Sequence, residues 1–299
     1  MAKLERKAFH KLIEPYVITS GKHFRLKDHD PGDTHGLKSQ DKPEAKELLE
    51  DGVRLLSEKQ DVLYAQSNWG LLLILQGMDA AGKDGTIKHV MSGVNPQGVD
   101  VHSFKAPSDE ELAHDFLWRT NRCLPTRGKI GIFNRSNYEE VLVVRVHPEI
   151  LEKQRIPDSL RGDHFWKGRY EDIRAVERYL TRNGFAIRKF FLNLSRKEQK
   201  RRFMERLDNE EKNWKFSTAD VRERKYWDEY QDAYEKMIRN TATEFAPWVI
   251  VPADNKWFTR LLVVATIVDA LDSLDLKYPK LTAAQLAELK EARKQLEKE

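Results

Sequence analysis

The chain has 299 residues, with 52 Lys and Arg against 48 Asp and Glu, and a formal net charge of +4. This length can form one large α/β domain, and the nearly balanced charges argue against a nucleic-acid coat protein, so we expect no nucleic-acid partner. Cys123 is the single cysteine, which excludes an intramolecular disulfide and favours the reducing cytoplasm. The apolar runs are too short for a membrane span, so we also expect no membrane partner.

The first 60 residues read as an extension that ends in a helix. Pro43 stands in the opening turn of this helix, and Leu48, Leu49, Val53, Leu56 and Leu63 recur at helical spacing up to about Tyr64. The next segment, 71–76, is apolar throughout. Such a run predicts a central parallel strand that is covered on both faces.

A glycine-framed loop follows this strand directly. Gly77 and Gly82-Lys83 have the spacing G-x-x-x-x-G-K, in which successive backbone N–H groups can surround a phosphate while the lysine adds a point charge. The helix expected over 84–91 would direct its positive end at the same anion. The predicted phosphate-binding residues of this loop are Gly77, Ala80, Ala81, Gly82, Lys83, Asp84 and Gly85.

One position departs from the usual loop. Asp84 replaces the Ser or Thr whose hydroxyl binds magnesium, so a metal must be held differently. Asp79, inside the loop, is the candidate, because its carboxylate can reach a cation on bound phosphates. The bare glycine pattern also arises by chance in turns, and its position between a strand and a helix argues against that alternative here.

The rest of the chain alternates strands with helices. We expect strands at 98–105, 129–133, 185–194 and 247–252, and helices at 109–120, 171–182 and 256–274, a helix beginning at Ser136 or Asn137, a long charged helical stretch up to about 241, and an amphipathic helix beyond 281. This order predicts a parallel sheet between two helical layers, with ligands at the carboxyl ends of the strands.

The third strand ends in a second candidate group. Asn134 stands where a phosphate-loop enzyme often has a magnesium-ordering acid, and its amide oxygen can bind a metal more weakly or through water. Arg135 would offer a planar fork to phosphate oxygens; a surface ion pair with Glu139 or Glu140 is the alternative.

These segments resemble a known family, the polyphosphate kinase 2 family, over most of residues 25–275. The resemblance is carried by Gly77-Met-Asp-Ala-Ala-Gly-Lys-Asp-Gly85, Asn95-Pro-Gln-Gly-Val99, Ser103-Phe-Lys-Ala-Pro107, Phe116-Leu-Trp-Arg119, Asn134-Arg-Ser-Asn-Tyr-Glu139, Lys212-Asn-Trp-Lys-Phe216, Tyr226-Trp-Asp228 and Val251-Pro-Ala-Asp-Asn-Lys-Trp257. It implies a P-loop kinase-like, three-layer α/β/α fold with a central parallel five-stranded sheet and a helical lid at about 195–240. The domain would then cover 61–275, between the extension at 1–60 and a charged helix at 276–299.

The resemblance also implies an activity. Family members transfer the terminal phosphate of inorganic polyphosphate to a nucleotide, or run the reverse reaction, with magnesium, which manganese can replace. It assigns catalysis to Asp79, Lys83 and Arg135, and it places the further phosphate-binding residues Arg201, Arg202 and Arg206 in the lid and Lys105, Arg119 and Arg122 along the substrate channels. Ion pairing on helices explains Lys105, Arg119 and Arg122 nearly as well.

Two positions are similar to the class III branch, whose members phosphorylate nucleoside monophosphates as well as diphosphates. Asn134 replaces the acid of the commonest pattern, and Glu139 follows Tyr138, so we expect Tyr138 and Glu139 to set acceptor specificity and Asp79, Asn134 and Glu139 to hold metal. The expected partners are polyphosphate and adenine or guanine nucleotides, with AMP, ADP and ATP foremost.

Two alternatives remain open on the residues themselves. The glycine loop is equally consistent with an ATP-dependent nucleotide kinase, and the basic residues between Arg161 and Lys225 are consistent with a non-catalytic protein that binds polyphosphate or nucleic acid. Donor preference separates the first from a polyphosphate-dependent enzyme. Unused apolar positions in the C-terminal helices lead us to expect a homo-oligomer.

Overall fold

A six-stranded sheet forms the centre of the molecule, in the order β1-β6-β5-β2-β4-β3. The computed structural model describes residues 9–214 and 216–299. Five strands are parallel, and β1 alone runs antiparallel to its neighbour β6. The strands are β1 (Val17–Ile18), β2 (Gly70–Gln76), β3 (Val99–Ser103), β4 (Ile130–Asn134), β5 (Phe185–Asn193) and β6 (Trp248–Pro252).

The parallel register brings functional segments to one edge of the sheet. Leu75 of β2 pairs with Asn134 of β4 on one side and with Phe190 of β5 on the other. The carboxyl ends of these neighbouring strands therefore lie together. Since the glycine loop follows β2 and Arg135 follows β4, the fold itself places both candidate groups at this edge.

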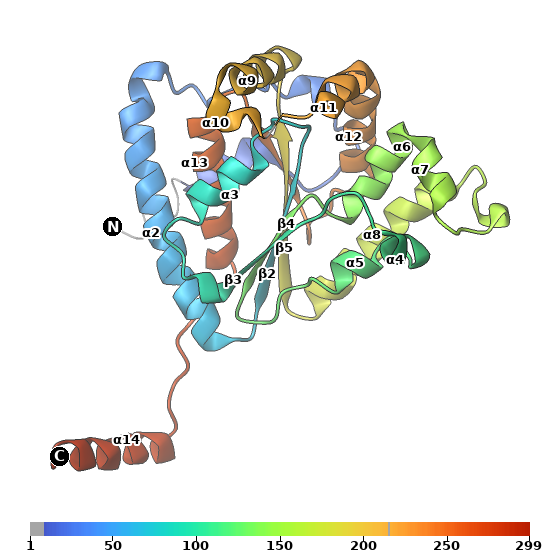
Figure 1. The fold of residues 1–299 in the computed structure, drawn as a ribbon. Helices are drawn as coiled ribbons and strands as arrows, with labels where there is room; N and C mark the ends of the chain where they lie inside the picture. Colours follow the sequence, from blue (N-terminus) through green and yellow to red (C-terminus); the bar gives the residue numbers. More distant parts are fainter. Residues whose placement is uncertain (1–8, 215) are drawn as a thin grey trace.

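Alternate residues of β2 face two separate hydrophobic cores. Leu71, Leu73 and Leu75 pack into one core, and Leu72 and Ile74 into the other. The first core is covered by α2 (Lys42–Gln66), α3 (Lys83–Val90) and α13 (Lys256–Asp272), and the second by α6 (Val143–Val146), α8 (Phe165–Arg182) and α12 (Trp227–Thr241). Figure 1 shows these two groups of helices on opposite sides of the sheet, which confirms the three-layer α/β/α prediction.

The remaining α-helices connect the strands or lie beyond α13, and α9–α11 occupy the segment predicted to form a lid. They are α4 (Asp109–Ala113), α5 (Trp118–Asn121), α7 (Pro148–Lys153), α9 (Arg196–Asp208), α10 (Glu210–Asn213), α11 (Thr218–Glu223) and α14 (Ala283–Leu296). In Figure 1, α9, α10 and α11 lie across the edge at which β2 ends, and α14 lies apart from the rest.

Two expected helices are broken in the structure. The segment 109–120 forms α4 and α5 because His114 leaves helical geometry (φ −99°, ψ 173°) and the Asp115 carboxylate accepts a hydrogen bond from Leu117 N at 2.9 Å, which starts a new turn. The charged stretch that follows Ser195 is divided in the same way, by non-helical Asn209 and Ser217, each of which caps the next short helix.

The antiparallel strand β1 was not predicted. It has only two residues, which carry no period-two pattern, and it pairs Val17 with Val249 at the outer edge of β6. This pairing, together with the packing of α2 against α13, joins 9–66 to the main body. Within the described residues, no helix is long and apolar enough to cross a membrane.

Candidate active site

The glycine loop has the backbone that an anion cradle requires. Gly82 adopts φ +103°, in the region that favours glycine, and a Cβ at Gly77 would lie 3.0 Å from the carbonyl oxygen of Leu192. Two non-glycine residues at the same edge, Ala80 and Arg135, are also left-handed, each with φ 64°. Such conformations are unfavourable for side-chain-bearing residues and cluster at functional sites.

Lys83 is buried beneath this loop. Its Nζ donates to the carbonyl oxygens of Gly77 at 2.5 Å and Met78 at 3.3 Å. Burial, and secondarily the positive charge of Arg135, lower the pKa of Lys83 to about 8. The loop lysine is thus a desolvated cation, whose charge an incoming phosphate would stabilise.

Arg135 brings two of the predicted acids together. Its Nη2 donates to Asp79 Oδ1 at 2.5 Å, and its Nη1 donates to Glu139 Oε2 at 3.2 Å. The Glu139 carboxylate, followed by Asp79, raises the pKa of Arg135. The Gln76 side-chain amide is oriented so that both its oxygen and its nitrogen have hydrogen-bond partners. Its nitrogen donates to Glu139 Oε1 at 2.8 Å, and its oxygen accepts from Ser136 Oγ at 3.1 Å. Glu139 is thereby held against the loop.

The acids and Asn134 form an oxygen-rich edge. Asn134 Nδ2 donates to Asp84 Oδ1 at 2.5 Å and to Ser103 Oγ at 3.4 Å. The described part of the chain contains no group of three or more His, Cys, Asp or Glu side chains that could hold a metal by itself. Magnesium usually takes one or two carboxylates and completes its shell with substrate phosphates and water, so Asp79 and Glu139, with the Asn134 amide, fit that ion.

Arg202 does not face the phosphate side of the loop, which corrects one prediction. It is buried, and its five N–H groups donate to the Glu198 carboxylate and to the carbonyls of Ala80, Ala81, Ala253 and Asp254. No donor is left for a phosphate. Arg202 therefore supports the loop from behind, which is a structural role.

The other two predicted lid arginines are paired on the lid itself. Arg201 is largely exposed and donates to Glu198 and Glu205 on its own helix. Arg206 of α9 lies 3.7 Å from the Asp220 carboxylate of α11, and so connects these two helices. Phosphate binding by Arg201 and Arg206 stays a prediction.

Tyr138 lies in the core, so direct contact with an acceptor is excluded. Its side chain is fully buried, its hydroxyl donates to Glu177 Oε1 at 2.6 Å, and Lys189 Nζ donates to that hydroxyl at 3.0 Å. The adjacent Glu139 faces the opposite way, toward Arg135. Of the pair expected to set acceptor specificity, only Glu139 can touch a substrate.

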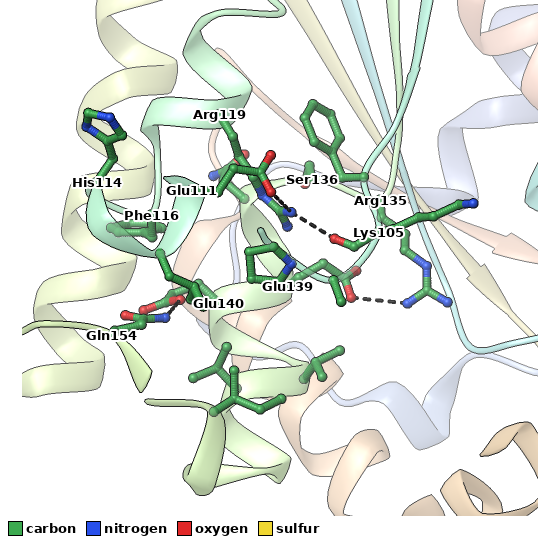
Figure 2. A pocket seen from close by; sticks show the side chains of 18 of the residues that line it. Lys105, Glu111, His114, Phe116, Arg119, Arg135, Ser136, Glu139, Glu140 and Gln154 are labelled. Atoms are coloured by element: carbon green, nitrogen blue, oxygen red, sulfur yellow. Dashed lines mark hydrogen bonds and ion pairs between the residues drawn. The ribbon is translucent and has the colours of Figure 1, made fainter. Parts of the chain in front are cut away.

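A cavity of about 390 Å³ opens beside Arg135 and Glu139. Figure 2 shows Arg135 and Lys105 on one side of it and Phe116, Glu140 and Gln154 on the other. Its walls are largely apolar, with contributions from Phe104, Ala106, Pro107, Leu112, Val143, Val144 and Ile150. A mostly apolar cavity with a charged end suits an amphipathic ligand that carries an anionic group.

The predicted channel residues divide at this cavity. Lys105 and Arg119 line it, and Arg119 Nη1 donates to the Lys105 carbonyl at 2.8 Å and lies 3.6 Å from Glu111. Arg122 instead stacks on Trp118, with its guanidinium 4.6 Å from the ring centroid, and does not line the cavity.

Comparison with known proteins identifies the family. The family model described as Polyphosphate kinase 2 (PPK2) matches residues 38–279. The chain belongs to this family.

Several polyphosphate kinase 2 relatives are similar over most of their length. The ADP-polyphosphate phosphotransferase of Rhodopseudomonas palustris is 55% identical over 84% of this chain and 87% of its own. The AMP/ADP-polyphosphate phosphotransferase of Meiothermus ruber is 45% identical over 89% of this chain and 96% of its own length. The crystal structure of polyphosphate kinase 2 from Arthrobacter aurescens TC1 superposes with a TM-score of 0.82 at 42% identity, covering 92% of this chain and 95% of that one.

Sequence reasoning missed several polar residues of this polyphosphate kinase 2 site. Gln199 of α9 donates to the Asp79 carbonyl at 2.9 Å and accepts from Arg224 at 2.6 Å, which ties α9 to the loop. Gln76 and Gln154 were also missed, since nothing in the local sequence marks a glutamine in a strand or loop as a site residue. The apolar Phe116 was missed as well, although it lies within a segment that carries the family resemblance.

Proposed function

We propose that the protein is a polyphosphate-dependent nucleotide kinase that transfers the terminal phosphate of inorganic polyphosphate to ADP and AMP, reversibly. The observation that supports this most directly is that the glycine loop and the cavity share residues. Arg135 contacts Asp79 of the loop and Glu139, and both Arg135 and Glu139 line the cavity. The donor chain would end at Lys83, and the acceptor nucleoside would fill the cavity.

The reaction needs positioning more than proton transfer. A terminal phosphate oxygen of the acceptor attacks the last phosphorus of the donor, the bridging P–O bond breaks, and polyphosphate becomes one unit shorter. Both partners are already ionised at neutral pH, so no general base is required. Lys83 and Arg135 offset the repulsion between the two polyanions and stabilise charge on the transferred group. Magnesium, which manganese can replace, supplies further positive charge; Asp79, Glu139 and Asn134 would hold it.

The acceptor range follows from Glu139. AMP lacks the β-phosphate through which ADP holds metal, and a carboxylate beside the acceptor can compensate by holding a metal itself. The M. ruber relative is named for both AMP and ADP, and the R. palustris relative for ADP. We therefore propose that AMP is converted to ADP and then to ATP.

An assay with polyphosphate, magnesium and either AMP or ADP tests this function. Glu139→Asn should slow the AMP reaction more than the ADP reaction, and Asp158→Asn, at a fully exposed position, is the matched control. A wild-type enzyme that phosphorylates ADP but not AMP would contradict the proposed acceptor range. Equal losses on both acceptors would contradict the role of Glu139.

Donor choice separates the two alternatives. An ATP-dependent kinase would turn over with ATP and a second nucleotide but not with polyphosphate, and a binding protein would turn over with neither. The pairing of Arg201 and Arg206 with acids on the lid gives little support to a nucleic-acid track. Guanine nucleotides as acceptors, a cytoplasmic location and a homo-oligomer are further parts of this proposal; light scattering of the purified chain tests the last.

A further inference from the structure

Arg169 of α8 stands behind the cavity without lining it. Its guanidinium carbon lies 4.5 Å from the ring centroid of Phe116 and 4.5 Å from that of Phe165. Its Nε donates to Glu140 Oε1 at 2.9 Å, and only 17% of its side chain is exposed. The remaining acid in reach, Asp172, is 3.8 Å away. The guanidinium thus contacts two aromatic rings while its Nε donates to a carboxylate.

Two partners of Arg169 are parts of the cavity wall. Phe116 and Glu140 both line the cavity, and Glu140 Oε2 accepts from Gln154 Nε2 at 2.7 Å, which brings in a third lining residue. These three residues come from separate segments: the turn between α4 and α5, the 3₁₀ helix η5 (Asn137–Val141), and the residue after α7. Through Arg169 and Glu140, one network links all three segments.

We infer that Arg169 is the positioning residue for the nucleoside end of the acceptor site. This inference rests on the proposed function, since it takes the cavity as the place where the nucleotide binds. Figure 2 shows Phe116 and Glu140 across the cavity from Arg135 and Lys105. By holding these two residues, Arg169 sets the distance between the nucleoside contacts and the reacting phosphate. Misplacement of such contacts weakens acceptor binding without removing any group that touches the donor.

The geometry requires arginine rather than any cation. The guanidinium carbon lies over two rings while Nε donates to a carboxylate, and a lysine ammonium, a compact point charge, cannot reproduce this combination. The charge of Arg169 is already compensated by the buried Glu140 carboxylate. Arg169 is therefore no part of a track for polyphosphate, although it lies in the basic region that the sequence singles out.

The test compares Arg169→Lys and Arg169→Met with a matched control on the same helix. Arg178→Lys is that control, because Arg178 also stacks on an aromatic ring, Phe245 at 4.9 Å, and its partners do not line the cavity. We expect KM for ADP to rise about tenfold in both Arg169 variants, while KM for polyphosphate changes less than about twofold. Arg178→Lys should change neither constant.

Two further variants separate a failure of the role given to Arg169 from a failure of the cavity as the nucleotide site. Glu140→Gln should raise KM for ADP as Arg169→Lys does, which keeps the test open if Arg169→Met does not fold. Ile150→Trp narrows the cavity itself. If Ile150→Trp leaves KM for ADP unchanged, the nucleotide does not bind in the cavity and that part of the proposed function fails.

If Ile150→Trp raises KM for ADP and folded Arg169→Lys does not, only the role of Arg169 fails. Equal increases in KM for ADP and for polyphosphate in Arg169→Lys would also overturn it, because the arginine would then act on the donor or on the fold as a whole. A selective rise in KM for ADP, with a melting temperature close to that of Arg178→Lys, supports it.

Discussion

Lys83→Met should make the pH dependence of stability different from that of the wild type. Folding lowers the pKa of Lys83 from 10.5 to about 8, so below pH 8 the folded protein bears the full cost of a buried charge. As pH rises from 8 towards 10.5, the folded protein releases the proton and the unfolded chain keeps it. The unfolded state then binds more protons, and wild-type stability rises relative to the variant. Between pH 7 and pH 10 the change amounts to about 2.5 kcal/mol.

Urea unfolding at the two pH values, followed by tryptophan fluorescence, measures this change. The quantity of interest is the unfolding free energy of the wild type minus that of Lys83→Met, and how this difference changes between the two pH values. Other titrating groups cancel in the difference, and any pH-independent cost of the substitution cancels in its change with pH. Lys167→Met removes a lysine that is 74% exposed and should give no such change. If the difference between wild type and Lys83→Met moves by less than about 1 kcal/mol, Lys83 is not desolvated in the free enzyme and the argument is wrong.

Three other predictions concern the loop and the core. Lys83→Ala should cost at least about a hundredfold in transfer rate with an unchanged near-ultraviolet circular dichroism spectrum, and a folded variant that keeps more than about a tenth of the rate would show that the loop is not the catalytic cradle. Asp79→Asn should raise the magnesium concentration needed for half-maximal rate, and an unchanged titration with normal activity would remove Asp79 from the metal shell. Lys189→Met removes the cation that lies 2.7 Å from the buried Glu177 carboxylate, leaves that charge uncompensated by a lysine in the core, and should cost about 3–5 kcal/mol in urea unfolding. Adding Glu177→Leu should restore most of this loss, and a single variant within about 1 kcal/mol of the wild type would refute the burial argument.

The loop and Arg135 could be predicted because local sequence determines where they lie. An apolar run predicts the parallel strand β2, and in a parallel sheet whatever follows a strand lies at the same edge as whatever follows its neighbour. The pairing of Leu75 with Asn134 realises that expectation. The edge strand β1 could not be predicted, because its two residues are too few to show a periodic pattern. Its position depends only on pairing with the edge of β6, which is distant in the sequence.

The roles of single basic residues could not be read from the sequence. Arg202 and Arg201 are adjacent in a charged helix, yet one is buried with all its donors used by the loop's surroundings and the other is exposed. A helix turns by 100° per residue, so neighbours face different environments, and only the packed structure shows which face meets the loop. Arg169 is a third case, in which the ring of Phe116 from a distant segment and the buried carboxylate of Glu140 determine the role.

The contacts of Arg135 in the free enzyme bear on how the Asp79→Asn result is to be interpreted. Arg135 now donates to both Asp79 and Glu139, so the same carboxylates that we assign to metal are occupied by the cation that we assign to phosphate. Binding of phosphate by Arg135 must weaken these two pairs, which makes the carboxylates available to magnesium at the moment when the polyanions arrive. Asp79→Asn removes a ligand but also releases Arg135 from one partner. Asp79→Asn should therefore raise the magnesium concentration needed for half-maximal rate more than it raises KM for polyphosphate. The freed Arg135 can bind phosphate more readily, and this partly offsets the increase in KM.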